Sequence, residues 1–164
     1  MSKKLLGAIH FFFLMILAFY AFLFKKSRFD WVYLIIEYSI YWSWTYHNGK
    51  CPISYYYVKY VEKKKKLGEI ESNDIITLFG EKHKEGMKKI LMLGALVMYC
   101  SLIVVFRRNN INFVFGLLPF PMYYLLCDFK VEAVNVLFGY IFFFYIVIMA
   151  YNLLKSFGKN RYLC

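Results

Sequence analysis

The sequence predicts an all-α protein, a multi-pass transmembrane helical bundle with five spans. Hydrophobic residues make up 61% of the 164-residue chain and aromatic residues 23%, which is more apolar material than a water-soluble domain of this length can bury. The apolar residues also form unbroken runs separated by short charged segments, whereas a soluble helix carries them in stripes. These two observations predict that much of the protein surface faces lipid.

The first two apolar runs predict a transmembrane hairpin over residues 1–46. Residues 5–24 form a run that lies between two lysine pairs and is long enough to cross a bilayer. The run continues past Ala18 and Ala21, so a retained signal anchor is favoured over a cleaved signal peptide. Residues 31–46 form a shorter run that contains Glu37 and carries aromatic residues at both ends, as expected for a span anchored at the interface.

Residues 47–89 are rich in lysine and predict a basic extramembrane loop with interfacial helices. Lysine stems can lie along apolar surface while their ammonium groups reach headgroups, and tyrosine rings suit the same boundary. A solvated charged loop is the alternative interpretation. The lysines expected to bind lipid or a partner protein are Lys63, Lys64, Lys65, Lys66, Lys82, Lys84, Lys88 and Lys89.

Residues 90–164 predict a three-span transmembrane bundle and a short tail. The three runs are residues 90–106, 111–127 and 134–154, and the segments between them are long enough only for tight hairpins. The middle run contains Gly116 and two prolines, so that helix is expected to be kinked, or re-entrant rather than spanning. Four spans plus a re-entrant segment is therefore the alternative to five.

The charge distribution predicts orientation and partners. With five spans, the N-terminus, the 47–89 loop and the loop at Asp128 share the side that is richer in Lys and Arg, which puts the long loop in the cytoplasm. Basic residues at 25–28 and 107–108 oppose this bias. The net charge of +11 predicts binding to membrane lipids with anionic headgroups or to an acidic protein surface, without sequence-specific nucleic-acid recognition.

Ionisable residues inside apolar runs are the candidates for chemistry. By helical rise, an antiparallel second span brings Glu37 to a depth near that of His10, and His47, Cys51 and Asp128 reach the same face. A polar or ion path through His10, Glu37, His47 and Asp128 is one interpretation, and His47 with Cys51 are the candidate metal ligands. The other is structural, with Glu37 hydrogen-bonded to a neighbouring helix. The spacing matches no metal motif, and we expect no cofactor.

One short block carries a resemblance to a known group of proteins. Residues 47–55 (HNGKCPISY), followed by a lysine-rich stretch and Leu67-Gly68, resemble a segment of small uncharacterised multi-pass membrane proteins of large DNA viruses. The resemblance implies a place in a viral internal membrane, or in host membranes remodelled during infection. It implies no activity and no catalytic residue. The expected protein partner is a second copy of the chain, in a homo-oligomer, or a viral structural protein.

Three functions compete on the sequence alone. A non-enzymatic structural or assembly protein is favoured, because the chain has no Gly-rich phosphate loop, no G-x-S-x-G and no channel filter motif, and no catalytic residue can be assigned. An oligomeric ion or proton channel or carrier that uses Glu37 and His10 is the first alternative. A small intramembrane enzyme that acts through His47 and Cys51 is the second.

Overall fold

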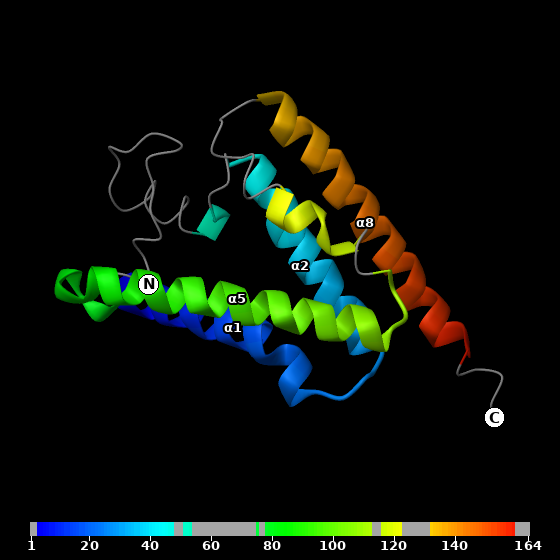
Figure 1. Ribbon diagram of the computed structural model, residues 1–164, viewed down its shortest axis with the longest axis horizontal. Helices are drawn as coiled ribbons and strands as arrows, with labels where there is room; N and C mark the ends of the chain where they lie inside the picture. The colour runs from blue at the N-terminus through cyan, green and yellow to red at the C-terminus, as the bar shows by residue number, and fades with distance from the viewer. Residues whose placement is uncertain are drawn as a thin grey trace.

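The computed structural model describes residues 3–47, 51–53, 75, 78–112, 116–122 and 132–159. Every regular element in these ranges is helical, which confirms the all-α prediction (Figure 1). The long helices are α1 (Lys3–Leu23), α2 (Phe29–Thr45), α5 (Lys84–Arg108) and α8 (Glu132–Lys159), and a short 3-10 turn, η1 (Glu81–His83), precedes α5.

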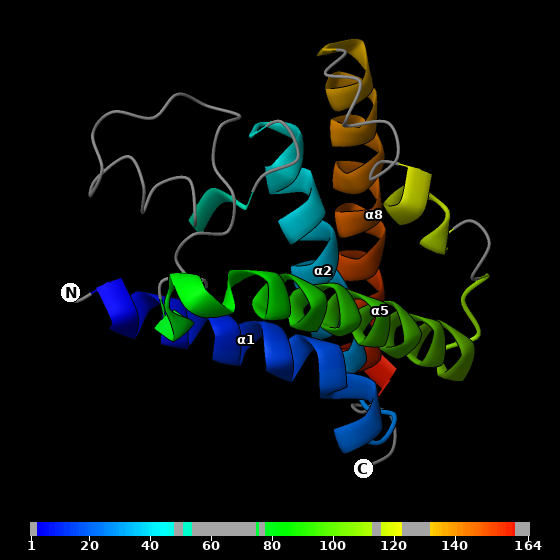
Figure 2. The ribbon, with the colours of Figure 1, turned by 60° about the vertical axis from the view of Figure 1, so that its left-hand side comes forward.

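The long helices are arranged as two packed pairs. Helices α1 and α5 lie side by side and run in the same direction, since Met15 meets Gly94 near the middle of the pair and Ala21 meets Ser101 two turns further on. A methyl group added at Gly94 would lie 3.4 Å from the Met15 Cε, so the end of the Met15 side chain packs over the glycine. This pair is horizontal in both views (Figures 1 and 2).

Helices α2 and α8 form the second pair and run antiparallel. The end of α2 meets the start of α8, where Thr45 lies against Gly139, and the start of α2 meets the end of α8, where the Arg28 guanidinium stacks over the Phe157 ring at 5.0 Å. The pair crosses the α1/α5 pair steeply in both views (Figures 1 and 2). The hairpin expected for residues 1–46 is therefore an open V, in which α1 and α2 each pack along a different partner.

An aromatic core fills the region where the two pairs meet. Tyr38 of α2 is fully buried, stacks on Tyr145 at 5.0 Å, and contacts Phe120 at 5.0 Å. Phe106 from α5 and Phe142 from α8 are fully buried in the same cluster. These large rings fill the space between helices that cross at a steep angle, where smaller aliphatic side chains would leave gaps.

Three of the helices are long and apolar enough to cross a membrane, and they indicate an integral membrane protein. The segments are Lys4–Leu23, Glu85–Arg108 and Glu132–Gly158. Large apolar side chains point outward along them, which in water would be an unfavourable surface. Helix α2 has 17 residues, which gives a length of about 25 Å at 1.5 Å per residue and sits at the short limit for a span. The count of five spans is not confirmed.

Helix α5 begins earlier than the apolar run that predicted it. The run starts at Ile90, but the helix starts at Lys84, with Glu85 in its first turn, where a negative charge complements the helix dipole. Lys84, Lys88 and Lys89, assigned from sequence to the basic loop, therefore belong to α5. Lys82 lies in η1 and is exposed, as is Lys89. The four consecutive lysines Lys63, Lys64, Lys65 and Lys66 lie outside the described residues.

The run at residues 111–127 differs from a continuous span in its described part. Residues 116–122 form helical turns interrupted at Leu118, next to the prolines that remove backbone donors. Gly116 is buried against the Phe106 ring, and an added Cβ would lie 2.0 Å from that ring, so only glycine fits. The Gly116 carbonyl accepts a hydrogen bond from the Tyr38 hydroxyl at 2.8 Å, which ties this segment to α2.

Candidate functional site

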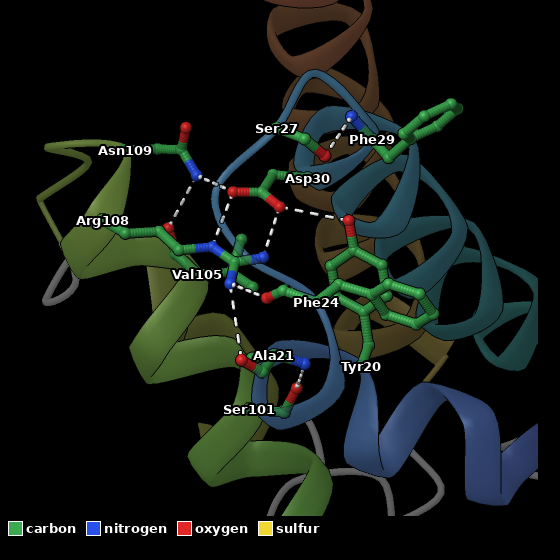
Figure 3. Close-up of polar contacts among 10 residues, drawn as sticks. All are labelled: Tyr20, Ala21, Phe24, Ser27, Phe29, Asp30, Ser101, Val105, Arg108 and Asn109. Carbon is green, nitrogen blue, oxygen red and sulfur yellow. Dashed lines mark hydrogen bonds and ion pairs between the residues drawn. The ribbon is translucent and has the colours of Figure 1, made fainter.

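The densest polar cluster in the described structure surrounds Asp30, at the start of α2 (Figure 3). Its carboxylate is fully buried and forms a two-pronged ion pair with Arg108, in which Arg108 Nε donates to Oδ2 at 2.7 Å and a terminal guanidinium nitrogen donates to Oδ1. Asn109 donates to Oδ2 at 2.6 Å, and the Tyr20 hydroxyl donates to Oδ1 at 3.1 Å. Each oxygen thus accepts two hydrogen bonds, close to the full capacity of a carboxylate.

Arg108 also joins the end of α1 to the end of α5. Its second terminal nitrogen donates to the Ala21 carbonyl, in the last turn of α1, at 3.4 Å. The same nitrogen donates to the Phe24 carbonyl, just beyond α1, at 2.7 Å (Figure 3). Carbonyls at a helix end have no partner within the helix and carry partial negative charge, so a guanidinium is a favourable neighbour. We call Asp30, Arg108, Asn109 and Tyr20 the Asp30 cluster; it links α1, α2 and α5.

Sequence reasoning missed the Asp30 cluster. It counted Arg108 only as a charge opposing the predicted orientation and began the second run at Trp31, one residue after Asp30. A signal was available, because the five-span topology puts the 25–30 and 107–110 turns on the same side of the membrane. Asp30 is the single acidic residue in those two basic turns.

Glu37, seven residues after Asp30 on α2, is in the opposite situation. Its side chain is fully buried, yet neither carboxylate oxygen has a hydrogen-bond partner in the described part of the chain. The hydroxyl of Tyr33, four residues earlier on the same helix face, is also buried and without a partner there. A buried carboxylate left alone costs several kcal/mol, so Glu37 requires a proton, an ordered water or a cation.

The expected meeting of His10 and Glu37 is not seen as a hydrogen bond, because α1 packs along α5 rather than along α2. His10 is 5% exposed, and its Nε2 lies 3.5 Å from the Cys51 Sγ. His47 caps the end of α2, with Nδ1 2.8 Å from the Ser43 carbonyl oxygen. The structure therefore brings together His10 and Cys51 from the predicted set.

The remaining site predictions have separate outcomes. Asp128 lies outside the described residues. Cys51 and His47 were proposed as metal ligands, and the described ranges contain no group of three or more His, Cys, Asp or Glu side chains arranged to hold an ion. A metal site that includes residues outside the described ranges stays a prediction.

A second polar surface lies beside the Asp30 cluster, at the same end of the molecule. It is an open pocket of about 560 Å³ between the α1–α2 turn and the ends of α5 and α8. Its lining combines two cationic side chains with hydrogen-bonding groups and one indole: Lys26, Ser27, Arg28, Trp31, Asn109 and Ser156. An indole beside exposed basic residues is the composition of a membrane–water interface.

Comparison with known proteins adds no relative. No protein family, curated protein or solved structure matches the chain.

Proposed function

We propose that this chain is a non-enzymatic integral membrane protein with a structural or assembly role. The observation that supports it is the Asp30 cluster: its charged and polar groups are used to hold α1, α2 and α5 to one another. A charge network whose groups pair across helices holds the geometry of a bundle. The resulting arrangement of two crossed helix pairs suits a scaffold in a membrane.

Anionic lipid is the partner that we propose for the basic segments, with an acidic protein surface, such as a viral structural protein, as the alternative. Support comes from the exposed Lys82 and Lys89, near the end of α5 that follows the lysine-rich segment. Each basic residue near an anionic surface contributes about 1 kcal/mol. We further propose that the 47–89 loop faces the cytoplasm, in keeping with its lysine content.

The test is assembly of a variant with the lysine run neutralised. Lys63, Lys64, Lys65 and Lys66 are replaced by Gln in the full chain, and complex size in native membranes and binding to phosphatidylserine vesicles are measured. The matched control replaces Lys25, Lys26, Arg28 and Arg107 by Gln, which removes the same formal charge at the opposite end of α5. We expect loss of assembly in the first variant alone; unchanged assembly in it would contradict the proposal.

A second function, an oligomeric proton or ion carrier, is favoured by one specific observation. Glu37 is a fully buried carboxyl whose oxygens have no hydrogen-bond partner in the described ranges, and intramembrane carboxyls of that kind mark ion paths. In reconstituted vesicles, flux that Glu37→Gln abolishes and Asp30→Asn leaves intact would establish this function. Equal flux in wild type and Glu37→Gln would exclude a role for Glu37 in transport.

A further inference from the structure

An apolar pocket lies inside the V, on the side away from the Asp30 cluster. It has a volume of about 220 Å³ and is enclosed by α1, α2, α5 and the 51–53 segment. Its walls come almost entirely from hydrocarbon, indole and thioether side chains, of which the main ones are Phe13, Leu14, Met15, Ile40, Trp44 and Met98. Such a lining favours an alkyl ligand over a polar one.

A histidine and a cysteine stand together in the wall of this pocket. His10 of α1 and Cys51 both line it, with His10 Nε2 3.5 Å from Cys51 Sγ. His10 is nine-tenths buried, whereas Cys51 is only partly buried. A thiol within hydrogen-bonding reach of an imidazole is the arrangement that activates cysteine nucleophiles.

We propose that Cys51 is an S-acylation site, at which His10 acts as general base and the apolar pocket receives the acyl chain. The acyl donor is a long-chain acyl thioester such as palmitoyl-coenzyme A. The pocket is smaller than the roughly 300–1,000 Å³ of typical small-molecule sites. It therefore holds one section of the chain, and the rest extends between the helices into lipid.

The reaction is a thioester exchange and needs no redox partner. The Cys51 Sγ attacks the carbonyl carbon of the donor while its proton passes to His10 Nε2. The new Sγ–carbon bond forms, the carbon–sulfur bond to the donor thiol breaks, and His10 returns the proton to the departing thiolate. The product is a thioester on Cys51, with the alkyl chain beside the side chains that line the pocket.

Acylation fits this site better than metal binding does. His10 and Cys51 supply two ligands, and the described ranges contain no third His, Cys, Asp or Glu placed with them to hold a metal. Structural zinc sites use four protein ligands and catalytic ones use three. The apolar lining, by contrast, matches a hydrocarbon chain. The acylated protein would gain a further membrane anchor beside the basic 47–89 segment.

The first test needs no substitution. The purified full-length chain in lipid nanodiscs is incubated with palmitoyl-coenzyme A, without any acyltransferase, and the adduct is located by peptide mapping and by its loss in neutral hydroxylamine. We expect one palmitoyl group on Cys51. An unmodified protein, or an adduct found equally on Cys100, Cys127 or Cys164, would overturn the proposal.

Two variants test the roles of the pair. Cys51→Ser should abolish the adduct, while Cys100→Ser, which removes an exposed thiol from α5, should leave it unchanged. His10→Gln should slow acylation by about 10²-fold, the lower value expected for loss of a general base. The folded state of His10→Gln is checked by the rate at which a small alkylating reagent modifies Cys100. An unchanged acylation rate in His10→Gln, with Cys100 reacting as in wild type, would exclude the histidine.

Discussion

Asp30 and Glu37 are two carboxyls on the same helix, both fully buried, with opposite surroundings. Asp30 accepts hydrogen bonds from Arg108, Asn109 and Tyr20, while Glu37 has no such partner in the described ranges. The two residues are seven positions apart, or about two helical turns. Their positions along α2 explain the difference.

The start of α2 is where three helix ends meet, and helix ends carry polar and charged residues. Asp30 is therefore surrounded by donors from the last turn of α5 and by the end of α1. Glu37 lies at mid-helix, where its two oxygens have no hydrogen-bond partner in the described ranges. A buried carboxyl is thus easily paired at a convergence of helix ends and hard to pair between them, which makes Asp30 structural and Glu37 the candidate for function.

The largest effect expected is from Asp30→Ala. Removing the carboxylate leaves Arg108 and Asn109 with only their backbone carbonyl acceptors, and breaking a buried ion pair costs about 3 kcal/mol. We expect the free energy of unfolding in mixed detergent micelles to fall by that amount. In a double-mutant cycle with Arg108→Ala, the two substitutions should be strongly non-additive. Additive effects would mean that the ion pair does not stabilise the bundle.

Arg108→Lys is expected to have an intermediate effect. Lysine keeps the charge but lacks the planar fork that binds both Asp30 oxygens and the Phe24 carbonyl together. We expect a loss of about 2 kcal/mol in the free energy of unfolding, equivalent to one hydrogen bond to a charged group. Arg107→Lys, on the exposed neighbouring residue, is the control and should be neutral. Equal stability of the two variants would show that charge alone suffices at position 108.

The helices were predictable from sequence and their arrangement was not. Unbroken apolar runs indicated α1, α5 and α8 to within six residues at each end, because the requirement for internally bonded backbone in lipid leaves helix as the available structure. The runs carry no information on which helix pairs with which. That choice depends on tertiary contacts such as Met15 against Gly94 and on aromatic packing around Tyr38.

The candidate site was predictable only in part, for the same reason. Glu37 and His10 were identified from their charge inside apolar runs, and both are buried. The partner of His10 depended on the tertiary arrangement, which puts the imidazole beside Cys51 rather than in a hydrogen bond with Glu37. Asp30 was missed because a carboxyl at the edge of an apolar run looks like an ordinary interfacial charge.

Glu37→Met tests whether the Glu37 carboxyl lacks a partner, and the substitution should stabilise the protein. Methionine matches glutamate in length and removes two oxygens that have no partner in the described ranges. We expect the free energy of unfolding to rise by about 1 kcal/mol, measured as for Asp30→Ala. A loss of stability instead would show that Glu37 is paired, through water, an ion or a segment outside the described residues.

The smallest effects come from two tyrosines that make a matched pair. Tyr20 and Tyr33 stack face to face at 4.4 Å, so removing either hydroxyl leaves the ring contact in place. The Tyr20 hydroxyl donates to Asp30, while the Tyr33 hydroxyl is buried without a partner in the described ranges. Tyr20→Phe should therefore cost about 1 kcal/mol in the free energy of unfolding, and Tyr33→Phe should cost nothing or stabilise slightly. Equal losses in the free energy of unfolding would contradict this prediction. They would show that the Tyr33 hydroxyl, like that of Tyr20, has a hydrogen-bond partner.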